Sequence, residues 1–156
     1  MPLAVPSCTG TSRADRLHSS SASCVVVADG RLLTIRHRFG GKLGLPGGTA
    51  HAGESATCTA QRETWEETGY EVRVTGMIGP RNPHSPIFTC ALLSGQEIRD
   101  RTVPPLHALP EVLGIYWMDP DDLRRSDWRF PNDLEWLPDA VKAIASRSTA
   151  DSGAGP

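Results

Sequence analysis

Apolar and polar positions in the first third of the chain form short runs separated by turn residues. Residues 24–28 are apolar and mostly β-branched, and a second apolar run, residues 32–35, follows the turn signal Asp29-Gly30. Two such runs joined by a two-residue turn predict a β-hairpin. We therefore expect the organised part of the chain to begin near Ser23.

The pattern then changes from strand to loop and from loop to helix. Residues 39–53 contain Gly40, five further glycines and one proline, which predicts a loop with unusual backbone freedom. Residues 55–68 hold neither proline nor glycine, and Gly69 follows where the C-terminus of a helix favours a positive φ. This segment is predicted to form a helix of about four turns.

Two strands are expected after this helix. Val72 and Val74 alternate with polar neighbours, and residues 87–93 form a continuous apolar run of strand length. Three prolines between them predict an irregular loop over residues 79–86. A loop that joins two strands is a candidate wall for a ligand site.

The last third of the chain predicts one more strand and two helices. Residues 112–118 have the composition of a strand, and Asp119 followed by Pro120 predicts a capped short helix through residue 125. Apolar residues on one face predict a final helix over residues 138–146.

Composition limits the class of protein. The chain has 156 residues, enough for one domain, and 16 Lys and Arg against 18 Asp and Glu give a net charge of −2. No block of like charge indicates a nucleic-acid or membrane surface, and no apolar run approaches the ~18 residues of a membrane span. We expect a soluble domain over residues 23–146, a flexible leader over 1–22 and a disordered tail over 147–156. A homodimer is compatible with the sequence.

Four cysteines stand far apart in the sequence. They show neither C-x-x-C spacing nor paired histidines, so a zinc site is not expected. Reduced thiols and a cytoplasmic location are the simplest interpretation, with Cys24, Cys58 and Cys90 as small core residues.

Three carboxylates on the predicted helix carry the candidate chemistry. Glu63, Glu66 and Glu67 are three and four residues apart, so they project from one side of the helix and repel one another. A hard divalent cation such as Mg²⁺ would offset this repulsion. Arg62 can reach Glu66 one turn on, and the glycine-rich loop before the helix gives backbone groups access to a phosphate.

Three glutamates alone are more often an ordinary solvated helix face, but their spacing resembles a known motif. The segment from Gly48 to Tyr70 is similar to the Nudix box, and residues 23–123 resemble a Nudix hydrolase domain. Thr64 and Tyr70 occupy two usually aliphatic positions, and Leu43 stands where an aromatic residue is common. All seven fixed positions of the box agree, namely Gly48, Glu54, Arg62, Glu63, Glu66, Glu67 and Gly69.

The resemblance implies an α/β fold, the Nudix α/β/α sandwich with a mixed sheet and a loop-helix-loop catalytic motif. It implies that Mg²⁺, for which Mn²⁺ can substitute, is bound by the carbonyl of Gly48 and the carboxylates of Glu63, Glu66 and Glu67. Arg62 would orient these carboxylates, and Glu54 would be an accessory ligand or a structural acid.

The general base remains open between Glu66 and Glu67 inside the box and Glu111 outside it. Glu111 is equally well explained as a surface residue at the start of a strand.

The implied activity is magnesium-dependent hydrolysis of a pyrophosphate bond in a nucleoside diphosphate derivative, a small-molecule nucleotide substrate. Pro86 lies sixteen positions after Tyr70, where relatives that cleave ADP-ribose tend to carry proline, and this weakly favours ADP-ribose or a nucleotide sugar. A house-cleaning (deoxy)nucleoside triphosphate pyrophosphatase is the alternative enzyme. A nucleotide-sensing module without catalysis is the alternative of another class, although such modules usually lose box carboxylates.

Several other polar and aromatic residues have two interpretations. Arg36, Arg38 and Lys42 would meet substrate phosphates or be surface charges, and Trp128 and Phe130 would stack on a base or pack the last helix. Four histidines are expected to be solvated, namely His37, His51, His84 and His107.

Overall fold

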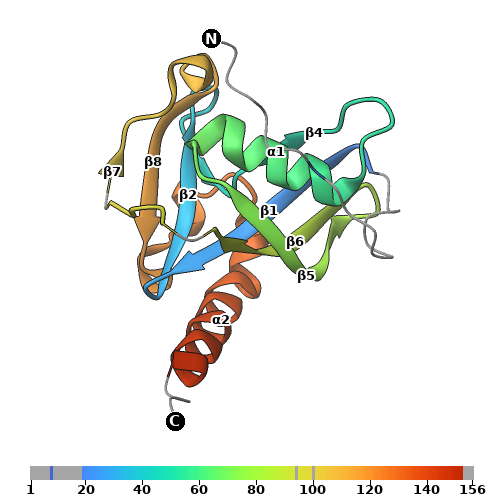
Figure 1. Cartoon of the computed structure of the whole chain (residues 1–156). Helices are drawn as coiled ribbons and strands as arrows, with labels where there is room; N and C mark the ends of the chain where they lie inside the picture. Colours follow the sequence, from blue (N-terminus) through green and yellow to red (C-terminus); the bar gives the residue numbers. More distant parts are fainter. Residues whose placement is uncertain (1–7, 9–18, 94, 100, 153–156) are drawn as a thin grey trace.

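The computed structural model describes residue 8 and residues 19–93, 95–99 and 101–152 (Figure 1). Most of the predicted leader and residues 153–156 of the predicted tail lie outside this part. The strands are β1 Ser21–Ala28, β2 Arg31–His37, β3 Leu43–Gly44, β4 Gly47–Thr49, β5 Val72–Asn82, β6 Ser85–Leu92, β7 Arg101–Thr102 and β8 Val112–Met118. The α-helices are α1 Ala56–Thr68 and α2 Leu137–Ser152, and short 3₁₀ helices span Leu106–Ala108, Pro120–Asp122, Arg125–Asp127 and Pro131–Glu135.

One mixed sheet organises the molecule. Its strand order is β5-β6-β1-β2-β8-β7, with β3 added to β2 and β4 added to β1. The central strands β1 and β6 run parallel, and the other pairs are antiparallel. The predicted hairpin is confirmed, because Ala28 pairs with Arg31 across Asp29 and Gly30, which both have positive φ.

Helices cover both faces of the sheet. Cys24 and Val26 of β1 pack in one apolar cluster with Ala56 and Ala60 of α1. Val25 points to the opposite face. There it packs in a second cluster with two residues of α2, Leu137 and Val141. The two layers are seen on either side of the sheet in Figure 1, and the predicted α/β/α sandwich with a mixed sheet is confirmed.

The helix predicted over residues 55–68 is confirmed with its end at Gly69, and Ser55 is its N-cap. The hydroxyl of Ser55 accepts a hydrogen bond from the backbone N–H of Cys58, and Gly69 ends the helix with φ 76°. The glycine-rich segment 39–53 is less irregular than predicted, since β3 and β4 lie within it.

The prediction of an irregular loop over residues 79–86 is wrong. β5 continues to Asn82 and β6 begins at Ser85, and Pro80 pairs with Pro86 across the two strands. β5 is the edge of the sheet, and β6 pairs with β1 only from Ile87 onward. Prolines are therefore tolerated where the neighbouring strand needs no N–H from them.

The C-terminal predictions need two corrections. The short helix after Asp119 is a 3₁₀ turn, Pro120–Asp122, in which the Asp119 carboxylate accepts a hydrogen bond from the N–H of Asp121. The final helix continues to Ser152, so the prediction of disorder is wrong for residues 147–152. At the other end, the domain begins at Ser21, two residues earlier than predicted.

The prediction of reduced thiols is also wrong in this structure. Cys24 of β1 and Cys90 of β6 form a disulfide between adjacent buried strands. Cys8, in the N-terminal segment, forms a second disulfide with Cys58 of α1. Cys24 and Cys90 do lie in the core, whereas Cys58 is only half-buried.

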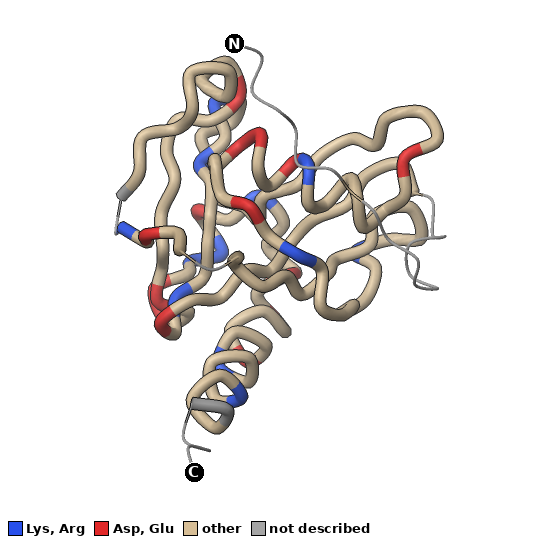
Figure 2. Tube along the Cα trace, viewed as in Figure 1, with Lys and Arg blue, Asp and Glu red and all other residues tan. Residues whose placement is uncertain are grey.

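Within the described part of the chain, no helix combines the length and the apolar character that crossing a membrane requires. Acidic and basic residues are interspersed along the trace (Figure 2).

Candidate active site

The loop before α1 is held against that helix by strand pairing. β4 pairs with β1, with Gly48 opposite Ala22, and this places the loop backbone beside the side chains of α1. Gly47 and Gly48 permit the close approach. A Cβ atom on Gly48 would lie 2.6 Å from the carboxyl carbon of Glu63, and one on Gly47 would lie 2.4 Å from the carbonyl oxygen of Ala22.

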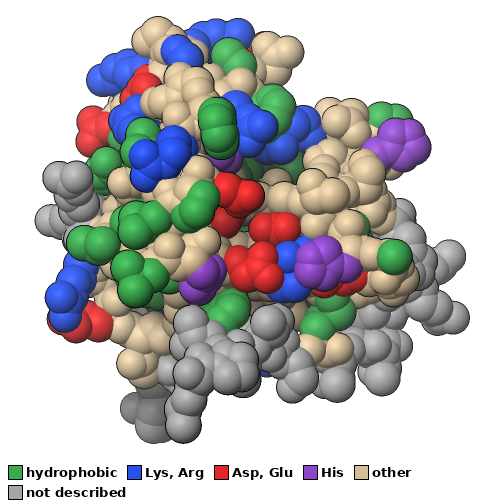
Figure 3. All heavy atoms as spheres, turned by 90° about the horizontal axis from the view of Figure 1, so that it is seen from above, with side chains coloured by type: hydrophobic (Ala, Val, Ile, Leu, Met, Phe, Trp, Pro, Cys, Tyr) green, Lys and Arg blue, Asp and Glu red, His purple; other side chains and the backbone are tan. Residues whose placement is uncertain are grey.

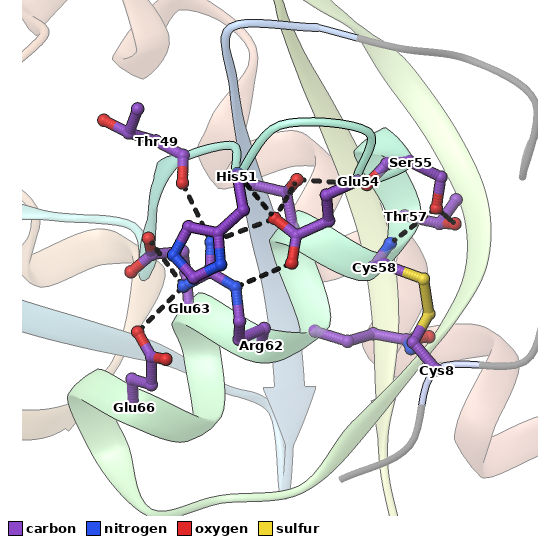
Figure 4. A network of polar contacts seen from close by, with 12 residues as sticks. Cys8, Thr49, His51, Glu54, Ser55, Thr57, Cys58, Arg62, Glu63 and Glu66 are labelled. Carbon is purple, nitrogen blue, oxygen red and sulfur yellow. Dashed lines mark hydrogen bonds and ion pairs between the residues drawn. A yellow bond between two sulfur atoms is a disulfide. The ribbon is translucent and has the colours of Figure 1, made fainter. Parts of the chain in front are cut away.

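Arg62 is the centre of a buried polar network (Figure 4). Its Nε donates to Oε2 of Glu54 at 2.7 Å and its Nη2 to Oε1 of the same carboxylate at 3.0 Å, so the pair is bidentate. Nη1 donates to Glu63 at 3.1 Å and to Glu66 at 2.9 Å, and Nη2 also donates to the carbonyl of Thr49 at 2.8 Å. One guanidinium group, 8% exposed, thus fixes three carboxylates and the loop.

Glu67 is held differently from the other carboxylates. It is 6% exposed, and its Oε2 accepts a hydrogen bond from the N–H of Gly47 at 3.0 Å. It has no ion-pair partner in the described part of the chain. Burial raises its pKa well above the usual range, and the charges of Glu63 and Glu111 add to this effect.

The pKa values of Glu54 and Glu63 move in opposite directions. The hydrogen bonds from Arg62 lower the pKa of Glu54 to about 2, whereas burial raises the pKa of Glu63. Because Arg62 satisfies Glu54 most fully, the network leaves negative charge without full compensation at Glu63 and Glu67.

Glu63, Glu66, Glu67 and Glu111 line an open cleft of about 700 Å³. In the space-filling view they form a compact acidic patch, flanked by histidines and, on one side, by a group of basic side chains (Figure 3). The structure brings Gly48, Arg62, Glu63, Glu66, Glu67 and Glu111 together on the walls of this cleft. Glu54 binds Arg62 and does not line the cleft.

As the side chains stand, no three or more His, Cys, Asp or Glu residues in the described ranges are arranged to hold a metal ion. Glu66 is turned toward Arg62, and Glu67 toward the backbone of Gly47. The roles predicted for these residues as metal ligands and catalysts remain predictions.

The four histidines were all expected to be solvated, but they differ in exposure. His37 is half-buried in the wall of the cleft, and burial, together with the charge of Arg129, lowers its pKa to about 4. His51 and His84 are exposed, as predicted. His107 is exposed too, and its ring stacks on Trp65 with centroids 5.7 Å apart.

The basic residues before the glycine loop have structural partners. Arg36 forms an ion pair with Asp127 at 3.0 Å, Arg38 donates to the carbonyl of Leu109, and Lys42 donates to the carbonyl of Ser126. They hold neighbouring segments in place and are not directed at a phosphate.

Segment 125–136 completes the wall of the site. Trp128 is 2% exposed and packs in the core, whereas Phe130 is 39% exposed and lines the cleft. Arg81 and Arg129 also line the cleft and were missed from the sequence. No local signal indicates them, because Arg81 is positioned by Asp133, 52 residues away.

Comparisons with known proteins agree with this geometry. A family model for the NUDIX domain matches residues 17–140. A MutT-like protein from Streptomyces ambofaciens is 34% identical over 113 residues, which cover 69% of this chain and 68% of the relative.

Two solved structures are similar in fold at 19% identity. A NUDIX hydrolase from Nitrosomonas europaea aligns with a TM-score of 0.64 over 81% of this chain and 72% of its own. An ADP-ribose pyrophosphatase from Streptococcus suis aligns with a TM-score of 0.58 over 77% of this chain and 89% of its own. With an intact box and this match over most of its length, the chain belongs to the Nudix hydrolase family, enzymes that act on phosphorus-containing anhydrides.

Proposed function

We propose that this protein hydrolyses, with Mg²⁺, the pyrophosphate bond of a nucleoside diphosphate derivative such as ADP-ribose or a nucleotide sugar. The observation that carries the proposal is the Arg62 network. It binds Glu54 and holds Glu63 and Glu66 beside the glycine loop, where both line an open cleft. Ordinary solvated glutamates need no buried arginine to hold them.

The donor set fits a hard divalent cation. Glu63, Glu66, Glu67 and the carbonyl of Gly48 offer oxygen ligands, which Mg²⁺ prefers. Burial raises the pKa of Glu63 and of Glu67, so a cation would stabilise charges that the protein alone leaves undercompensated. When bound, the metal neutralises pyrophosphate charge and lowers the pKa of a coordinated water.

The side chains around the proposed metal have separate roles. Arg62 holds Glu54, Glu63 and Glu66 in fixed positions, so little reorganisation is needed when substrate binds. Glu67 is buried and fixed to Gly47, which suits a ligand better than a proton carrier. Glu111 is exposed on the cleft wall and Glu66 is one-third exposed, so both can meet a water molecule and are our candidates for the general base.

The name of a structurally similar protein supports the choice of substrate class. The similar structure from Streptococcus suis is named an ADP-ribose pyrophosphatase. Pro86 lends no further support to ADP-ribose, because it is buried and does not line the cleft.

The test is product release from a panel of ADP-ribose, nucleotide sugars and nucleoside triphosphates, with and without Mg²⁺. We expect metal-dependent turnover, lowered about 10²-fold or more by Glu66→Gln and by Glu67→Gln while the fold is retained. Glu71→Gln, an exposed residue after α1, is the matched control.

Three outcomes would overturn parts of the proposal. Unchanged turnover in both variants would refute the carboxylate assignment. Faster turnover of triphosphates than of diphosphate derivatives would favour the house-cleaning alternative. Tight binding without turnover would identify a sensing module.

A further inference from the structure

A second cavity opens beside the acidic cleft. It encloses about 840 Å³ between the end of β5, the start of β6 and segment 125–136. Arg81, Arg129 and Phe130 line both the cavity and the cleft. A ligand held at the carboxylates can therefore extend past these three side chains into the cavity.

The walls of this cavity suit a flat aromatic group. Ile78, Ile87, Phe130 and Trp136 give it an apolar and aromatic lining, and Asn132 adds an amide at the edge. Its volume lies in the range of about 300–1,000 Å³ that is typical of small-molecule sites. Nucleobases are bound in such sites by stacking, with few polar contacts.

The junction of cavity and cleft is positively charged. Arg81 is fixed there by buried Asp133 at 2.9 Å, with its guanidinium 4.1 Å from the centroid of the Phe130 ring. The guanidinium of Arg129 lies 5.2 Å from the same centroid. Among the described residues, Arg129 forms no ion pair with a carboxylate, and its charge reaches Glu67 and slightly opposes the rise in the pKa of that group. Arg129 is thus placed between the acidic site and the cavity, where a phosphate would lie.

Two residues that line the cleft but not the cavity are open to solvent. The side chain of Phe39 is 82% exposed, and His51 is exposed as well. These residues offer little enclosed surface to recognise a specific group.

We propose that the cavity behind Phe130 binds the nucleobase of the substrate, with Arg129 on the phosphates and the second group of the substrate directed toward Phe39. This inference rests on the proposed function for the identity of the substrate. It makes the base, and not the second group, the part that the protein selects. Ile78 and Phe130 are then specificity-determining residues.

The test uses variants that fill the cavity and leave Arg81 and Arg129 unchanged. Ile78 is on edge strand β5 and is 37% exposed, so Ile78→Trp should be tolerated and should occupy the cavity. Met77→Trp is the matched control, since Met77 is the neighbouring residue, 50% exposed, and does not line the cavity. Ile78→Glu is a second variant that places a charge in the cavity instead of bulk.

Binding is measured by calorimetry with Mg²⁺, using α,β-methylene-ADP and, as the base-free probe, methylenediphosphonate. Neither probe is cleaved, so the result does not depend on turnover, which is measured separately on ADP-ribose. We expect the wild-type protein and Met77→Trp to bind the nucleotide at least about tenfold more tightly than the base-free probe. Both Ile78 variants should lose this difference while still binding methylenediphosphonate.

The inference is overturned if the Ile78 variants keep the preference, or if the wild-type protein shows none. It is also overturned if Phe39→Ala, and not the Ile78 variants, removes the preference, because the base would then lie against Phe39. Absence of turnover on ADP-ribose with the binding pattern intact would count against the proposed function alone.

Discussion

Replacing Glu54 with glutamine tests whether the Arg62 network stabilises the fold. Oε2 of Glu54 accepts from Nε of Arg62 at 2.7 Å, and Oε1 accepts from Nη2 of Arg62, from the hydroxyl of Thr59 and from the N–H of His51. A glutamine has one acceptor oxygen and would turn an amide toward the guanidinium group. Glu54→Gln should therefore lose the bidentate ion pair and keep the volume.

The size of the stability that Glu54 contributes follows from its pKa. The hydrogen bonds from Arg62 lower it from an ordinary 4.5 to about 2, which corresponds to about 3 kcal/mol of stability at neutral pH. Water reaches the rim of this pair and screens it, so we discount the value to about 1.5 kcal/mol. Because the pKa is lower in the folded state, the contribution is present above about pH 4.5 and is lost as the pH falls toward 2.

Urea denaturation of the wild-type protein and Glu54→Gln, with EDTA, over pH 7 to 3 measures this contribution. We expect the difference in the free energy of unfolding to be about 1.5 kcal/mol at pH 7 and to fall by more than half at pH 3. Glu97→Gln is the control, since Glu97 pairs with Arg99 on the surface with 73% of its side chain exposed. A difference that does not change with pH, or an equal effect of the control, would refute the reasoning.

Three further substitutions are expected to have distinct effects. Gly48→Ala should lower kcat at least about tenfold, because the added Cβ displaces the carboxylate of Glu63, and steady-state kinetics with a melting curve will separate this from unfolding. Glu67→Gln should raise the free energy of unfolding, measured by calorimetry without metal, by about 1–2 kcal/mol. The pKa of the Glu67 carboxyl is raised in the folded state, so this group lowers the stability of the fold as the pH rises, and glutamine removes its charge. A loss of stability would contradict this. Pro86→Ala should leave the ratio of kcat/KM for ADP-ribose and a triphosphate unchanged, because Pro86 faces Pro80 within the sheet and not the site.

Local sequence signals predicted the parts of the fold that depend on neighbouring residues. The hairpin at Asp29-Gly30 and the helix between Ser55 and Gly69 each contain their own turn or cap residues. The strand predicted over residues 112–118 is observed with the same ends, Val112–Met118. The grouping of the box residues was predicted for the same reason, since their spacing on one helix determines which side chains meet.

Predictions failed where distant residues decide the structure. Three prolines indicated a loop over residues 79–86, but the place of β5 at the sheet edge allows Pro80 to lie within a strand. Spacing in the sequence gave no sign that Cys24 would meet Cys90, because the parallel pairing of β1 and β6 brings them together. Arg129 was missed because its position depends on contacts made by the whole segment around it.

Those contacts explain why chemistry and specificity differ in how well a sequence reveals them. The box supplies the acidic site from one loop and one helix. The wall that carries Arg129 and Phe130 is instead attached to β2 and the glycine loop through residues distant in the sequence. The contacts are the Arg36–Asp127 ion pair, the hydrogen bond of Lys42 to the carbonyl of Ser126, and the hydrogen bond from the N–H of Arg129 to the carbonyl of Leu43 at 2.8 Å. We therefore expect Arg36 and Lys42 to affect substrate binding through the placement of Arg129. Substitutions at these two positions should raise KM and leave kcat nearly unchanged, whereas substitutions in the box should lower kcat.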